Sequence, residues 1–158
     1  MYVLQLDLGM FYKRRDYSRI ENGKNPIVAH EYLGREVAGK DVIIVDDMIS
    51  SGESIIDVAT KLKNKGAKRI FVFSSFGLFV NGLEVFDKAY AEGIFDKIFT
   101  TNLIYRDPGL ESRDWHYEVD MSKYVSLLID TLNHDETISH LLNPVTKIQN
   151  LIAKKDNK

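Results

Sequence analysis

Residues 42–54 read VIIVDDMISSGES, and this stretch decides the fold. It begins with four apolar residues that are typical of a buried strand, continues through the acidic pair Asp46 and Asp47, and ends in a short polar turn around Gly52. We expect a helix to begin near Ser54, because apolar residues recur beyond it at helical spacing. The predicted order is therefore a strand, an acidic pair, a loop and a helix.

This order is suited to binding an anion. The first N–H groups of a helix have no acceptor within the helix, so they attract phosphate. Gly52 permits a backbone conformation that turns N–H groups inward, and the hydroxyls of Ser50, Ser51 and Ser54 can donate as well. Of Glu53, only the backbone is expected to face such a ligand.

The two carboxylates before the loop suggest which anion binds. Asp46 and Asp47 are hydrogen-bond acceptors that suit sugar hydroxyls, so the stretch favours a sugar phosphate as the ligand. The alternative is an ordinary strand, turn and helix in which both acids are simply solvated at the end of the strand.

Strand-like and helix-like segments alternate along the chain, which favours an α/β domain with a mostly parallel sheet. Residues 14–25 are polar and are predicted to form a loop. We expect one domain over residues 1–143, followed by a helical turn and a frayed tail over residues 144–158. The expected strands are 8–12, 30–37, 42–45, 70–75, 97–101 and 117–119, and the expected helices are 54–65, 83–91 and 121–133, with helical turns at 138–142 and 145–153.

Composition excludes several classes of function. The 158 residues are 44% hydrophobic and 28% charged with a formal net charge of −2, so no strong positive field is available for nucleic acid. No apolar run approaches the length needed to cross a bilayer, and the first residues lack the pattern of a signal peptide. The absence of cysteine excludes disulfides and cysteine-based zinc sites. We expect a cytoplasmic protein with neither a nucleic-acid nor a membrane partner.

Other polar and aromatic residues receive structural interpretations. The four histidines show no metal-binding spacing and are expected to lie at the surface or to serve in packing. Trp115 is expected in a buried cluster, and Asp120 is expected to cap the helix over residues 121–133.

The run from Val42 to Ser54 resembles the 5-phosphoribosyl-1-diphosphate (PRPP) motif, which type I phosphoribosyltransferases share with ribose-phosphate pyrophosphokinases (PRPP synthetases). A Lys-Arg-Arg run at residues 13–15, a Phe-Gly-Leu-Phe run at 76–79 and a Thr-Thr-Asn run at 100–102 favour the synthetases. From about Leu8 to Leu132 the chain is similar to the carboxyl-terminal half of such an enzyme. The resemblance implies a three-layer α/β fold of the phosphoribosyltransferase type.

The resemblance also implies an activity and its residues. Synthetases of this family use Mg²⁺ and transfer diphosphate from ATP to ribose 5-phosphate, which makes PRPP for nucleotide biosynthesis. Asp46 and Asp47 would hold the ribose, and residues 50–54 would hold the 5-phosphate. Lys13 and Arg15 would be catalytic, because cations at this place stabilise the transferring diphosphoryl group. The resemblance assigns no metal ligand in this chain.

Two departures from the family pattern shape the expected function. Synthetases commonly read Asp-Thr-Ala-Gly-Thr where residues 50–54 read SSGES, so Ser50 replaces an aspartate that contacts ribose. Family synthetases are also much longer and hold ATP largely through their amino-terminal domain. We expect the chain to bind ribose 5-phosphate or PRPP, to meet ATP only with a completing domain, and to be inactive alone.

Whether the chain is itself an enzyme therefore stays open. We expect a homo- or hetero-oligomer. The alternatives are a non-catalytic regulatory subunit that binds PRPP or another sugar phosphate, and a nucleobase phosphoribosyltransferase.

Overall fold

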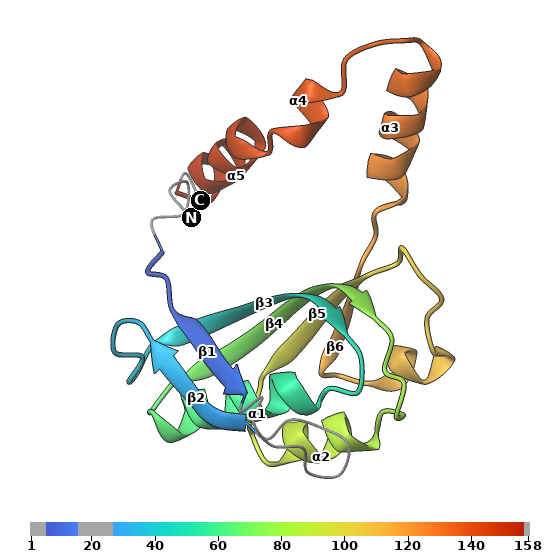
Figure 1. Cartoon of the computed structure of the whole chain (residues 1–158). Helices are drawn as coiled ribbons and strands as arrows, with labels where there is room; N and C mark the ends of the chain where they lie inside the picture. Colours follow the sequence, from blue (N-terminus) through green and yellow to red (C-terminus); the bar gives the residue numbers. More distant parts are fainter. Residues whose placement is uncertain (1–5, 16–26, 157–158) are drawn as a thin grey trace. The chain divides into compact units, whose positions relative to one another are not determined.

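The computed structural model describes residues 6–15 and 27–156, which fall into two units (Figure 1). One unit comprises Met1–Glu36 with Pro144–Lys158, and the other comprises Val37–Asn143. In the first, strands β1 (Met10–Arg15) and β2 (Ile27–Leu33) form an antiparallel hairpin, and α5 (Val145–Asp156) is the helix.

The larger unit is built on a four-stranded parallel sheet in the order β3-β4-β5-β6. Its spatial order follows the chain order, so each strand reaches its neighbour through one crossover connection. The strands are β3 (Asp41–Ile49), β4 (Arg69–Gly77), β5 (Lys97–Thr101) and β6 (His116–Val119). The crossovers contain α1 (Glu53–Asn64), α2 (Glu84–Ala91) and the 3-10 turn η1 (Pro108–Ser112), and α3 (Ser122–Asn133) and α4 (Ser139–Leu142) follow β6.

The core lies between the sheet and the helices α1 and α2. Figure 1 shows both helices on the same side of the sheet, as crossovers of one handedness require. The central strands bury residues on this side completely, among them Ile70, Val72 and Ile98 at 0% exposure. The helices bury the apolar stripes that the sequence pattern predicts, namely Ile55, Ala59 and Leu62 of α1 and Phe86 and Ala89 of α2.

The opposite face of the same sheet carries exposed apolar side chains. Successive strand residues point to opposite faces, so Val45 and Phe73 lie on the side away from α1 and α2. Val45 is 78% exposed and Tyr117 is 55% exposed, while the ring of Phe73 stacks on Phe99 at 4.4 Å between centroids. Parallel sheets are normally covered on both faces, so this aromatic face is unusual for the fold.

The predicted fold class is confirmed: the chain is α/β, and its larger sheet is wholly parallel. The predicted alternation of strand and helix is present in the order β3, α1, β4 and α2. Strands β3 to β6 form the sheet of the expected three-layer arrangement, and helices α1 and α2 form one of its helical layers. The division into domains at residues 143 and 144 stays a prediction. None of the described helices is both long and apolar enough to pass through a bilayer.

Several strand boundaries differ from the prediction. β3 continues beyond Val45 to Ile49, because Met48 and Ile49 still pair with Phe76 and Gly77 of β4. β2 covers Ile27–Leu33 rather than 30–37, because its pairing partner β1 determines where the ladder ends. Pairing partners far away in the chain leave no mark in local composition, so strand ends are the weakest part of a sequence-based assignment.

The expected start of the polar loop at Arg14 is wrong. The backbone of Lys13, Arg14 and Arg15 belongs to β1, where these residues pair with β2. The polar composition of this run disguised an antiparallel strand, since hairpin strands need only one apolar face. The remainder of the predicted loop, residues 16–25, lies outside the described residues.

We predict opposite responses to the same substitution on the two faces of the sheet. Val72→Thr places a hydroxyl in the apolar core and should lower the free energy of unfolding by about 1–3 kcal/mol. Val45→Thr leaves the new hydroxyl in water and should change it by less than about 0.5 kcal/mol. Urea unfolding of both variants measures the difference, and equal losses would show that the exposed face is buried in solution.

Candidate functional site

The loop between β3 and α1 has the geometry of a helix entrance. α1 begins at Glu53, one residue before the predicted start, and its N-cap is Gly52 at φ 85° and ψ −15°. This left-handed conformation is readily available only to glycine. The carbonyl of Gly52 accepts the first helical hydrogen bond from the N–H of Ile56 at 3.0 Å. The N-cap is therefore Gly52, and its left-handed backbone conformation leads the loop into the helix.

The start of α1 leaves N–H groups for a ligand. A helix provides no internal acceptor for its first N–H groups, and no side chain of the described residues caps this helix. The helix dipole adds a partial positive charge at the same place. The loop therefore presents donors without supplying its own acceptor, as an anion site requires.

A second loop lies directly beside the first. The N–H of Leu78 donates to the carbonyl of Ile49 at 2.9 Å, and the N–H of Val80 donates to the carbonyl of Ser50 at 3.1 Å. Between them, Phe79 adopts φ 47°, which is uncommon for a residue other than glycine. The connection from β4 to α2 thus holds the beginning of the β3–α1 loop in place.

The acidic pair lies within the last part of β3 instead of beyond its end. Asp46 is half-buried and Asp47 is exposed, and the N–H of Asp47 donates to Oδ1 of Asp46 at 2.9 Å. Burial raises the pKa of Asp46, and the neighbouring Asp47 carboxyl raises that pKa further, against hydrogen bonds from the backbone N–H groups of Asp47 and Met48. Burial therefore disfavours the charged form of Asp46 in the free protein, and a ligand that donates to this carboxylate would offset part of that effect.

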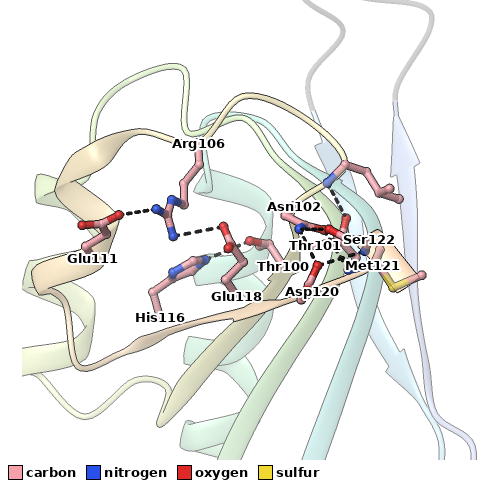
Figure 2. Close-up of polar contacts among 11 residues, drawn as sticks. Thr100, Thr101, Asn102, Arg106, Glu111, His116, Glu118, Asp120, Met121 and Ser122 are labelled. Atoms are coloured by element: carbon pink, nitrogen blue, oxygen red, sulfur yellow. Dashed lines mark hydrogen bonds and ion pairs between the residues drawn. The ribbon is translucent and has the colours of Figure 1, made fainter. Parts of the chain in front are cut away.

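A polar network joins the end of β5 to the start of α3 (Figure 2). The side chain of Asn102 donates from Nδ2 to Asp120 at 2.8 Å and accepts from the N–H of Met121 at 2.8 Å. Asp120 also accepts from the N–H of Ser122 at 2.9 Å. The formal N-cap is Met121, one residue after the predicted Asp120, although the Asp120 carboxylate still satisfies an N–H in the first turn. Asn102 thus serves in strand-end packing.

His116 makes a separate polar contact, which Figure 2 also shows. One ring nitrogen, Nε2, lies 2.9 Å from Oγ1 of the buried Thr100. Arg106 lies nearby and pairs with Glu118 at 3.1 Å and with Glu111. Burial, and then the positive charge of Arg106, lower the pKa of His116 to about 4. His116 is therefore neutral near pH 7 and serves in packing, as predicted.

Trp115 lies in the buried cluster that the sequence predicts. It is 2% exposed, and its Nε1 donates to Asp87 at 2.7 Å. Arg113 donates to the same carboxylate from Nη2 at 2.9 Å and holds the pKa of Asp87 below its ordinary value. The indole therefore has its polar atom satisfied within the core, as burial of a tryptophan requires.

The structure brings some of the predicted site residues together. Asp46, Asp47 and residues 50–54 form one continuous strand, loop and helix start in the larger unit. Lys13 and Arg15 belong to the smaller unit, and their side chains lie outside the described residues, so their role stays a prediction. Among the described residues no group of three or more side chains is arranged to hold a metal ion.

Sequence reasoning missed the residues that support the loop. Phe79, Val80 and Phe86 contact or hold the β3–α1 loop, although they follow it by about thirty residues. Phe79 lies in the Phe-Gly-Leu-Phe run noted above, but the apolar character of Val80 and Phe86 marks them only as core candidates. The glycines at 77 and 82 mark the connection as turn-rich, which is the one further signal.

Neutralising Asp46 should stabilise the free protein. Because the pKa of Asp46 is raised, the folded state disfavours its charged form, so Asp46→Asn should raise the free energy of unfolding at pH 7. We expect less than about 1 kcal/mol, because the carboxyl remains partly in water. The gain should disappear below pH 3.8, the ordinary pKa, where the wild-type carboxyl is protonated in both states. Chemical denaturation at both pH values measures this, and a loss of stability at pH 7 would contradict it.

Acid should destabilise the protein through His116. The unfolded histidine takes up its proton near its ordinary pKa of 6.5, whereas the folded one does so at about 4. The contribution of His116 is therefore complete above pH 6.5 and is lost as the pH falls toward 4, by at most about 1.4 kcal/mol per pH unit. Melting curves across this range should show a shallower slope for His116→Gln than for the exposed control His140→Gln. Equal slopes would contradict the assignment.

Sequence comparison places the chain among known proteins. Residues 19–143 match the family model of the phosphoribosyl synthetase-associated domain. The chain is 25% identical over 138 residues to the ribose-phosphate pyrophosphokinase of Vibrio cholerae, which covers 87% of this chain and 41% of that protein. It is 39% identical over 103 residues to the ribose-phosphate pyrophosphokinase of Mycoplasma pneumoniae, which covers 64% of this chain and 29% of that protein. The chain thus spans less than half the length of these curated relatives.

Structural comparison agrees on the fold. The crystal structure of phosphoribosylpyrophosphate synthetase from Mycobacterium smegmatis matches with a TM-score of 0.55 and 19% sequence identity, over 73% of this chain and 35% of that one. At this identity the likeness concerns the fold alone. Since the family model covers most of its length, the chain belongs to the phosphoribosyl synthetase-associated domain family and is homologous to the carboxyl-terminal portion of ribose-phosphate pyrophosphokinases.

Proposed function

We propose that this chain is the ribose-5-phosphate-binding, carboxyl-terminal portion of a ribose-phosphate diphosphokinase. Such an enzyme transfers diphosphate from ATP to ribose 5-phosphate to make PRPP. One observation carries the proposal: two carboxylates at the end of β3 lead within a few residues to the uncapped start of α1. Membership of the family supports the same ligand.

The β3–α1 loop would bind the 5-phosphate. The N–H groups at the start of α1 would donate to phosphate oxygens, together with the hydroxyls of Ser50, Ser51 and Ser54. Gly52 allows the turn, and Glu53 would contribute its N–H while its exposed side chain points into solvent. The phosphate would thereby complete the hydrogen bonding of the helix start.

The acidic pair would bind the ribose. Ribose hydroxyls donate hydrogen bonds, and the carboxylates of Asp46 and Asp47 accept them. Ser50 lies where synthetases commonly have a further aspartate, and a serine hydroxyl can still accept or donate at that place. We therefore expect the contact between Ser50 and ribose to be a hydrogen bond from an uncharged side chain.

Magnesium fits this arrangement only as an ion shared with the substrate. Mg²⁺ is usually held by one or two carboxylates with waters and phosphate oxygens, and Asp46 and Asp47 offer two carboxylates. Bound there, it would neutralise charge on the diphosphate. Lys13 and Arg15 would stabilise the transferring group from the protein side, as cations do in phosphoryl transfer.

Diphosphate transfer would require more than this chain. The alignment with the Vibrio cholerae enzyme covers 41% of that protein, so most of its length has no counterpart here. We propose that ATP is bound with a completing domain or chain, that the protein works as an oligomer in the cytoplasm, and that alone it is inactive. A second candidate is a non-catalytic regulatory subunit that binds PRPP or another sugar phosphate, which the acidic pair and the start of α1 would support equally well.

We predict that the purified chain binds ribose 5-phosphate in the presence of Mg²⁺. Isothermal titration calorimetry should show saturable binding that Asp47→Ala weakens by at least about tenfold, because a charge-assisted hydrogen bond contributes about 1.5–3 kcal/mol. Asp57→Ala is the matched control, since Asp57 is an acid on α1 that forms an exposed ion pair with Lys61.

Two results of this titration, and one result of a separate activity assay with PRPP and a nucleobase, have distinct meanings. Absence of binding by folded wild-type protein would reject the proposed function. Equal weakening by both variants would reject the role of the acidic pair. Base-dependent consumption of PRPP would instead identify a nucleobase phosphoribosyltransferase.

A further inference from the structure

A cluster of aromatic rings lies beneath the β3–α1 loop. Phe86 of α2 is 0% exposed and stacks on Trp115 with centroids 5.6 Å apart and planes inclined by 23°. Phe79 meets Phe86 edge to face at 5.0 Å. Phe95 also contacts the indole, edge to face with Trp115 at 6.0 Å, and is 1% exposed. The two phenylalanines are thus equally buried around one indole.

Of these two, Phe86 is the ring that contacts the loop. A methyl group built on Gly52 would lie 2.1 Å from Cζ and 2.7 Å from Cε1 of Phe86, which is closer than real side chains approach. The α-carbon of Gly52 therefore rests directly on the ring. No atom of Phe95 is among the three nearest to that position.

Phe79 of the same cluster lies in the segment that holds the beginning of the loop. The ring of Phe79 is buried against Phe86 while its backbone is in the left-handed region at φ 47°. Phe79 is the residue between Leu78 and Val80. The N–H groups of these two neighbours donate to the carbonyls of Ile49 and Ser50. The beginning of the loop is thus tied by backbone hydrogen bonds and its end rests on an aromatic ring.

We propose that Phe86 is a positioning residue for the loop, and that its ring sets the left-handed conformation of Gly52 and the direction of the N–H groups at the start of α1. A short loop that is not supported would have to be ordered by its ligand, at the expense of backbone conformational entropy for each residue fixed. A loop already ordered by a rigid ring binds without that cost. The inference rests on the proposed function for its ligand and on the contacts of Gly52 for its mechanism.

The test compares Phe86→Leu with Phe95→Leu in the full chain. Both changes remove an equally buried ring next to Trp115, so both should lower stability by similar amounts, but only the first removes the support of Gly52. Phe86→Met is made in parallel, because its unbranched, flexible side chain can fill an irregular gap that leucine leaves, which keeps the test independent of the folding of one variant. All proteins are measured at a temperature where thermal unfolding shows each of them fully folded.

The first measurement is the dissociation constant for ribose 5-phosphate with Mg²⁺. We expect Phe86→Leu to weaken binding by about tenfold, equivalent to the ordering of one loop residue, and Phe95→Leu by less than about twofold. Equal affinities for the two variants would overturn the proposal. A role in stability alone would affect both variants alike.

The second measurement needs no ligand and separates this inference from the proposed function. Amide hydrogen exchange of residues 50–54 should be faster in Phe86→Leu than in Phe95→Leu, while exchange in β4 and β5 changes equally in both. If wild-type protein binds no ribose 5-phosphate, the proposed function fails and exchange alone decides the role of Phe86. Equal exchange of residues 50–54 in the two variants would overturn that role whatever the ligand.

Discussion

The parallel pairing of β3 with β4 is the constraint on which the rest of the larger unit depends. It places Asp46 beside Ser74 and Ile49 beside Gly77, so β3 and β4 end at the same edge of the sheet. The β3–α1 loop and the β4–α2 connection then start side by side, which allows the hydrogen bonds from Leu78 and Val80 to reach the carbonyls of Ile49 and Ser50. Open parallel sheets bind ligands at this edge for the same reason: neighbouring strands deliver their loops to one place.

The site is assembled from two kinds of support that differ in their physical origin. The donors come from the local geometry of a helix start, which any strand, loop and helix of this type supplies. The direction of those donors depends on packing, because Gly52 is confined by the ring of Phe86 and by its own left-handed conformation. A local motif therefore provides the chemical groups, and a distant core provides their arrangement.

The sheet has two faces with contrasting roles. The face toward α1 and α2 is buried and ends in the polar contacts of Thr100 and His116. The other face carries the stacked rings of Phe73 and Phe99 together with the exposed Val45. Strands with apolar residues on both faces are typical of sheets covered on both sides.

The sequence by itself determined the local order of strand, acidic pair, loop and helix. The period of apolar residues and the glycine in the turn are properties of neighbouring residues, and the resemblance to the synthetases depended on that same run. It also determined the α/β class and the burial of Trp115. Only the tertiary structure decided where β1 and β3 end, that Phe86 lies under Gly52, and that His116 has a pKa of about 4. These features arise from contacts between residues far apart in the chain, whose pairing is set by the packing of the whole unit and leaves no periodic signal in the sequence.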